Sequence, residues 1–271
     1  MNQPGFSSRL SVPALQFEGV SKRFTARGRS SEVLAVRDIN FRVAGGEVVS
    51  IIGPSGCGKS TLLNMGAGLS RPSAGLVRVG GEPVTGPNKH VAFMLQKDLL
   101  MPWRTIAENV EFGLELRAVA SQRRQEVSHR LLKQCHLQGF EKHYPHQLSG
   151  GMRQRAAMAR TLAVDPLVLL MDEPFSALDA QTKMILQQDL AQTVAREGKT
   201  MVFITHDLAE AAALSDRILV MSKRPGTFIE EIAVDMPDRD NPMQRRKHTR
   251  LSELVSHLMS LLKLDAHSKV H

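Results

Sequence analysis

The sequence has few cysteines and few of the larger aromatic residues. It holds only two cysteines, Cys57 and Cys135, in 271 residues. Their separation matches neither a disulfide framework nor the spacing of a zinc site, which favours a reducing compartment. One Trp and one Tyr supply little of the stacking surface that proteins use along single-stranded nucleic acid.

Long apolar runs are also lacking. No stretch reaches the roughly twenty apolar residues of a membrane span, and the first residues, MNQPGFSSRLSVPALQF, lack the apolar core of a signal peptide. We therefore expect the chain to lie beside a membrane, if one is involved, rather than to cross it. The net charge of +8 favours an anionic partner. The densest basic runs, Arg123-Arg124 and Arg245-Arg246-Lys247, are short, and we interpret them as solvated faces.

Three continuous apolar runs indicate a buried, mostly parallel sheet. EVVSIIG, LVLLMDE and TMVFITH are typical of strands covered on both faces, and helical patterns separate them, as βαβ units require. Residues 15–91 carry mostly strand signals. INFRV alternates, and VRVGGEPV indicates a hairpin that turns at Gly80-Gly81. The pattern predicts an α/β core with an N-terminal antiparallel β subdomain.

Two further segments differ from this core. Residues from about 98 to 150 are polar and lack a buried strand, which predicts an inserted α-helical subdomain within a domain spanning 15–235. Residues 236–271 begin with a charged, turn-rich linker, PDRDNPMQRRKH, and continue with leucines at helical spacing. This predicts an amphipathic helix, docked on its own domain or bound to a partner.

A phosphate-binding loop follows the first buried run. GPSGCGKST matches G-x-x-x-x-G-K-[ST] between a strand and a helix, the context that the motif requires. Its glycines let backbone N–H groups surround a phosphate, Lys59 reaches the β- and γ-phosphates, and Ser60 can ligate Mg²⁺. We assign Cys57 no catalytic role, because such phosphoryl transfer uses no protein nucleophile. The predicted nucleotide contacts here are Gly53, Pro54, Ser55, Gly56, Cys57, Gly58, Lys59, Ser60 and Thr61.

Polar residues end the other apolar runs. Asp172 is suited to hold Mg²⁺, and the adjacent Glu173 is suited to activate water as a general base. His206 ends another strand where parallel sheets present ligand-facing groups. Gln96, after a shorter apolar run, is placed to contact water or metal. His206 is as readily interpreted as structural.

LSGGMRQR contains a second turn suited to bind a phosphate, with Ser149, Gly150 and Gly151 before a helix. With GPSGCGKST, LVLLMDE and SALD, it resembles the ATPase subunit of ABC transporters over roughly residues 15–230. The resemblance implies a P-loop NTPase that uses ATP and Mg²⁺, with Gln96 as the coupling glutamine and His206 as the switch histidine. It also implies a dimer, most simply a homodimer, in which Ser149, Gly150 and Gly151 face the partner's nucleotide. The resemblance further implies that the chain binds permease subunits and acts with an external solute-binding protein. It implies a peripheral position on the cytoplasmic face of the cell membrane and no nucleic-acid partner.

The family usually stacks adenine on an aromatic residue near the first strands, most often Tyr. Here Phe24 matches that position, and the alternative is that Phe24 is a core residue. The stretch LLMPWRT resembles importers of the nitrate, sulfonate and taurine type, in which this segment helps to receive the permease. Trp103 is then an interface anchor or, alternatively, a plug of the helical core. An exporter or lipid-transport ATPase is a competing interpretation, and a soluble ABC protein that acts on DNA or ribosomes is a weaker one.

Overall fold

A six-stranded sheet forms the centre of the computed structural model, which describes residues 12–25 and 32–263. The strand order is β10-β9-β3-β8-β7-β6. All neighbours pair in parallel except β9 and β10. The central strands β3, β7 and β8 are buried along their whole length, as their continuous apolar sequences predict. The strands are β3 (Val48–Ile52), β6 (Val91–Met94), β7 (Val168–Asp172), β8 (Thr200–Ile204), β9 (Arg217–Met221) and β10 (Phe228–Ala233).

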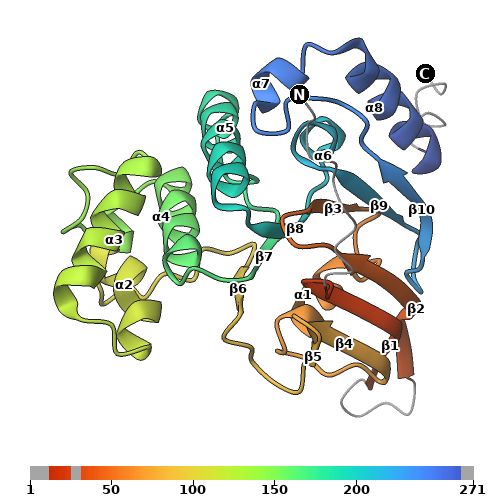
Figure 1. The fold of residues 1–271 in the computed structure, drawn as a ribbon, viewed down its shortest axis with the longest axis horizontal. Coiled ribbons are helices and arrows are strands. Elements are labelled where there is room, and N and C mark those ends of the chain that lie inside the picture. The colour runs from red at the N-terminus through yellow and green to blue at the C-terminus, as the bar shows by residue number, and fades with distance from the viewer. Residues whose placement is uncertain (1–11, 26–31, 264–271) are drawn as a thin grey trace, which may run out of the picture.

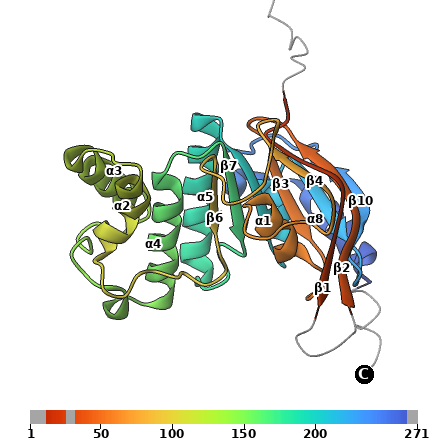
Figure 2. The same cartoon turned by 90° about the horizontal axis from the view of Figure 1, so that it is seen from below.

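A four-stranded antiparallel sheet packs beside the core, in the order β2-β1-β4-β5 (Figures 1 and 2). Its inner face is apolar, with the rings of Phe17 and Phe41 stacked at 4.6 Å. The predicted hairpin is present, because β4 and β5 pair across Gly80 and Gly81, which both have positive φ. The α/β fold with an antiparallel β subdomain is thus confirmed. The strands are β1 (Leu15–Thr25), β2 (Glu32–Val43), β4 (Ala74–Val79) and β5 (Glu82–Pro83).

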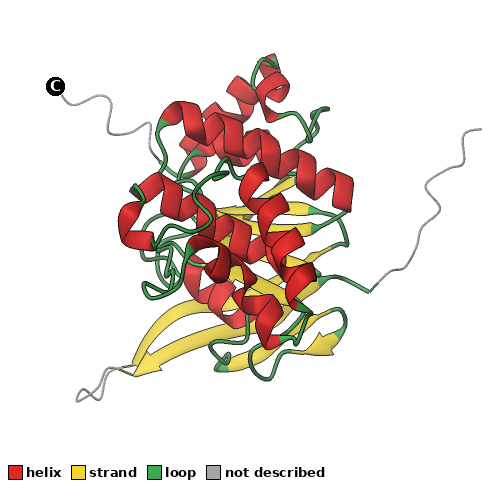
Figure 3. Ribbon diagram, turned by 90° about the vertical axis from the view of Figure 1, so that its left-hand side faces the viewer, coloured by secondary structure: helices red, strands yellow, loops and turns green. Residues whose placement is uncertain are grey.

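Most helices gather on the side of the central sheet opposite the antiparallel sheet (Figure 3), whereas α1 packs between the two sheets (Figure 2). Within the range predicted as a helical subdomain lie α2 (Ile106–Leu116), α3 (Ser121–Gln134) and the 3₁₀ turn η1 (Pro145–Gln147). The next helix, α4 (Gly150–Ala163), packs against both α2 and α3. The helical layer therefore continues past residue 150 through the whole of α4. The core helices are α1 (Lys59–Gly66), α5 (Ala180–Glu197) and α6 (Leu208–Leu214).

The C-terminal segment docks on its own domain. Helices α7 (Pro242–Arg245) and α8 (Thr249–Leu261) lie over α6 and β9 (Figure 1), and Leu251 and Leu258 are buried there. This confirms the docked interpretation of the amphipathic helix. The solvated-face interpretation of Arg245 is wrong, because its side chain is only 1% exposed. Its guanidinium donates to Ser215 O at 2.8 Å and Met236 O at 2.7 Å, so the tail is fastened rather than a loose linker.

Candidate functional site

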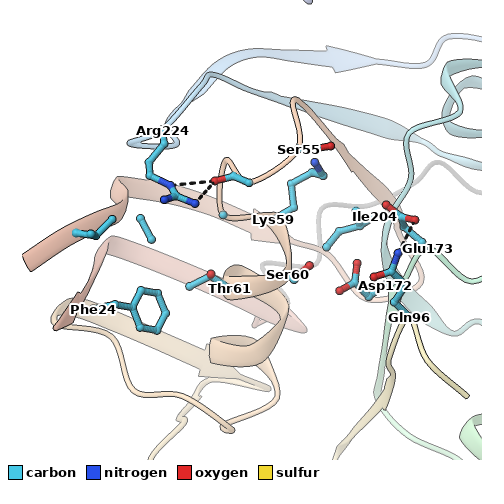
Figure 4. A pocket seen from close by; sticks show the side chains of 14 residues that line it. Phe24, Ser55, Lys59, Ser60, Thr61, Gln96, Asp172, Glu173, Ile204 and Arg224 are labelled. Atoms are coloured by element: carbon cyan, nitrogen blue, oxygen red, sulfur yellow. Dashed lines mark hydrogen bonds between the residues drawn. The ribbon is translucent and has the colours of Figure 1, made fainter. Parts of the chain in front are cut away.

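Four parallel strands end at the same edge of the central sheet, and their next residues form the site. The phosphate loop follows β3, Gln96 follows β6, and Glu173 and His206 follow β7 and β8. A cavity of about 560 Å³ opens there (Figure 4). The predicted site residues that line it are Phe24, Ser55, Gly56, Gly58, Lys59, Ser60, Thr61, Gln96, Asp172 and Glu173. It is also lined by Val33, Ala35, Ile204 and Arg224, which the sequence interpretation missed.

The phosphate loop has a backbone that requires glycine at its turns. Gly56 and Gly58 have φ values of 74° and 110°, and a Cβ on Gly58 would lie 2.3 Å from Val36 Cγ1. The Lys59 ammonium donates to Gly53 O at 2.7 Å and Pro54 O at 2.9 Å. The lysine thus lies over its own loop, where a phosphate oxygen would replace these carbonyl acceptors. The loop fits a nucleotide phosphate on these grounds.

Two adjacent carboxylates stand at the other end of the cavity. Asp172 is buried, and burial raises the pKa of its carboxyl above the ordinary value, although the Ser60 hydroxyl and Lys59 oppose that rise. Glu173 has a φ of 51°, a conformation that costs energy in a non-glycine residue and that gathers at functional sites. Its backbone N–H donates to Ile204 O at 3.0 Å, which holds this turn against β8.

The Glu173 carboxylate is flanked by the two other polar residues predicted from the strand ends. Glu173 Oε2 accepts a hydrogen bond of 3.0 Å from Gln96 Nε2, and His206 Nδ1 lies 3.5 Å from the same oxygen. His206 is 70% exposed at its side chain and lines a neighbouring cavity with Gly53 and Pro54 rather than the main one. The fold thus brings Gln96, Glu173 and His206 together at one point.

Comparisons with known proteins identify the arrangement. A family model described as ABC transporter matches residues 36–176. An uncharacterised ABC transporter ATP-binding protein of Methanocaldococcus jannaschii is 47% identical over 222 residues, 82% of each chain. The chain belongs to the ABC transporter ATP-binding family. The taurine import ATP-binding protein TauB of Yersinia pestis is 43% identical over 205 residues, 76% of this chain and 80% of TauB.

A solved structure agrees. The ATP-binding cassette MJ0796, in a dimeric post-hydrolysis state bound to ADP and Pi, matches with a TM-score of 0.75 and 32% identity, covering 82% of this chain and 99% of that one. This chain is therefore an ABC ATPase, which binds and hydrolyses ATP as a transporter subunit. Within the described ranges, none of its helices has the length and apolar character of a membrane span.

Several predicted residues of this ABC ATPase lie outside the main cavity. Cys57 is buried under the loop with 1% exposure. Ser149, Gly150 and Gly151 do not line the cavity. Ser149 caps α4 by accepting a hydrogen bond of 3.3 Å from Met152 N. Gly150 is exposed beside it, and Gly151 is half-buried.

Two aromatic residues are exposed where the sequence left alternatives open. Phe24 is 46% exposed at the end of β1 and lines the cavity, with Lys22 Nζ 5.2 Å from its ring centroid. Trp103 is 74% exposed, in the loop before α2. The core interpretations of both residues are therefore wrong, and both offer an aromatic surface to a ligand or partner.

Proposed function

We propose that this ABC ATPase holds Mg²⁺ and ATP between the phosphate loop and the ends of β6 and β7. The observation that carries this proposal is the single cavity in which Lys59, Ser60, Asp172 and Glu173 meet. Adenine would stack on Phe24, the loop amides and Lys59 would bind the phosphates, and the γ-phosphate would lie toward Glu173.

The donors present fit a magnesium ion. The Ser60 hydroxyl, the Asp172 carboxylate and the Gln96 amide oxygen are hard oxygen ligands of the kind Mg²⁺ prefers. Among the described residues, no group of three or more Asp, Glu, His or Cys side chains forms a metal site, so this site depends on phosphate oxygens as well. Bound there, Mg²⁺ would neutralise charge on the β- and γ-phosphates.

We assign the chemistry to Glu173 and its two neighbours. Glu173 accepts a proton from the attacking water as general base. Gln96 fixes the direction of the carboxylate through its 3.0 Å hydrogen bond. His206 lies beside the same carboxylate, where it would contact the γ-phosphate. Glu173 and Asp172 are adjacent in sequence at the end of β7, and Glu173 has a positive φ.

We further propose that the catalytic unit is a dimer of this chain. The helix terminus at Ser149, Gly150 and Gly151 is outside its own nucleotide cavity and accessible to a partner. In a head-to-tail dimer it would close on the partner's γ-phosphate, where N–H groups and a helix dipole favour an anion. The solved relative is a dimer, which supports this assembly.

The cargo that we propose is nitrate, a sulfonate, taurine or a similar small solute. Its support is the likeness to TauB and the exposed Trp103. The ATPase would sit peripherally on the cytoplasmic face of the cell membrane against permease subunits, with a solute-binding protein on the outer side.

The experiment that tests the transport role removes this gene from its host. Cells are supplied with labelled taurine or nitrate, and uptake is compared after complementation with wild type or Glu173→Gln. Uptake of one of these solutes should be restored by wild type and not by the variant. Unchanged uptake of both solutes, or a defect in efflux of a preloaded solute instead, would contradict the proposed importer.

A further inference from the structure

The turn between β9 and β10 packs against the phosphate loop. Ser222 N donates to Thr227 O at 2.9 Å and closes the turn. Gly226 joins it to β2, because Gly226 N donates to Ala35 O at 2.9 Å and Arg37 N donates to Gly226 O at 3.0 Å. A Cβ on Gly226 would lie 2.1 Å from Cys57 O. The turn thus approaches the loop so closely that only glycine fits at this position.

Arg224, in the middle of this turn, donates hydrogen bonds directly to the loop. Its Nε and Nη2 donate to Gly56 O at 3.1 and 2.8 Å (Figure 4). In a trans peptide the carbonyl and the following N–H lie in one plane and point in opposite directions. By holding Gly56 O, Arg224 therefore also fixes the direction of the Cys57 N–H. That N–H donates to Pro54 O at 3.4 Å, a long hydrogen bond whose acceptor a phosphate oxygen would replace.

The position of Arg224 along the cavity indicates which part of the nucleotide it serves. Figure 4 shows Arg224 at the end occupied by Phe24, far from Asp172 and Glu173. The two hydrogen bonds to Gly56 use Nε and Nη2, and no described residue accepts from Nη1. In the nucleotide placement proposed above, this guanidinium group would stand where the nucleoside end joins the phosphate chain.

We propose that Arg224 is a nucleotide-binding residue: it holds the phosphate loop in its binding conformation and places its charge beside the α-phosphate. This inference rests on the nucleotide placement proposed above. The α-phosphate is common to ATP and ADP and does not react. Arg224 therefore contributes to the affinity of both nucleotides and leaves the chemical step unchanged.

The test compares Arg224→Ala with Lys223→Ala in the full-length protein. Lys223 is the neighbouring basic residue of the same turn, is exposed, and does not line the nucleotide cavity, so its removal controls for net charge. Binding of Mg·ADP and of a non-hydrolysable Mg·ATP analogue is measured by calorimetry. Arg224→Ala should weaken both by about 10-fold, the low end for a hydrogen bond to a charged group because the site is open to water, and Lys223→Ala should not.

Two more readouts separate a charge near the phosphate from a purely structural clamp. Affinity for ADP should depend less on KCl concentration in Arg224→Ala than in wild type, because one charge contact is gone. Arg224→Lys should recover part of the lost affinity. In steady-state assays, Arg224→Ala should raise the KM for ATP by a larger factor than it lowers kcat.

The results that overturn the inference differ from those that overturn the site. Arg224→Ala with unchanged ADP affinity, or with a loss confined to kcat, would refute a role at the α-phosphate. An unaltered salt dependence with Arg224→Lys no better than Arg224→Ala would also refute it. Lys59→Ala is measured in parallel: if Lys59→Ala binds nucleotide as wild type does, the proposed nucleotide site itself is wrong.

Discussion

Glu173→Gln is the substitution that tests the proposed chemistry most directly. Glutamine has the shape of glutamate but cannot accept a proton from water at neutral pH. In the structure the changed atoms are those that contact Gln96 Nε2 at 3.0 Å and lie near His206 Nδ1 at 3.5 Å. The phosphate loop and Asp172 are untouched, so ATP and Mg²⁺ should bind as in wild type.

The expected loss is the contribution of a general base, about 10²- to 10⁴-fold in kcat. At 1.36 kcal/mol per tenfold change, this corresponds to about 2.7 to 5.4 kcal/mol in the activation barrier. Because hydrolysis is what removes the γ-phosphate from between the subunits, the variant should accumulate as an ATP-bound dimer. Wild type should dimerise only transiently.

Phosphate release under steady-state conditions measures the turnover, and light scattering after size-exclusion chromatography with ATP measures the dimer. Glu82→Gln, at an exposed position in β5, is the matched control and should behave as wild type. Retention of more than about a tenth of the wild-type rate by Glu173→Gln would refute its role as general base. A monomeric variant that binds ATP at full affinity would refute the head-to-tail dimer.

Three other outcomes follow from the structure. Arg245→Met should lower the free energy of unfolding by about 2–4 kcal/mol in urea titrations, because buried carbonyl oxygens lose a charged donor; a change below about 0.5 kcal/mol would contradict the fastening of the tail. Trp103→Ala should leave the ATPase rate of the isolated chain unchanged and abolish co-purification with permease subunits from solubilised membranes; intact co-purification would remove Trp103 from that interface. Burial raises the pKa of the Cys135 thiol to about 12, so between about pH 8 and pH 10 the unfolded chain loses this proton and the native chain keeps it. Wild type should therefore lose stability relative to Cys135→Ala over that range, and parallel pH profiles would contradict this.

The sequence best predicts those residues of the cavity whose position depends on their own segment. A phosphate loop needs its glycines, Lys59 and Ser60 at fixed spacings between a strand and a helix. The motif can therefore be recognised from the sequence alone. Asp172 and Glu173 could be predicted for a related reason. An apolar strand places its final residues at the carboxyl edge of the sheet, where the loop also lies.

The residues that the sequence concealed depend on contacts between distant segments. Arg224 reaches Gly56 across 168 positions of sequence, and only the β9-β10 pairing brings them together. The signal that was available is the PG turn after the buried run RILVM, which places a basic residue at the same sheet edge. For Arg245 the sequence led to a wrong prediction, that of an exposed side chain. A run of three basic residues resembles a solvated face, and only the docking of α7 and α8 makes its first member a buried donor.

The docked tail also joins the hydrogen-bond network beside His206. Arg246, which directly follows α7, donates to Gln187 Oε1 at 2.6 Å, and Gln187 donates to Glu210 Oε2 at 2.9 Å. Lys183 then joins Glu210 to Asp207, with 2.8 Å to each carboxylate. Asp207 directly follows His206 and caps α6, whose first turn contains Glu210. Because a buried charge that loses its partner is costly, losing a member of this network would destabilise the buried Glu210 carboxylate. The turn that carries His206 is thus linked by hydrogen bonds and ion pairs to a segment outside the family's motifs.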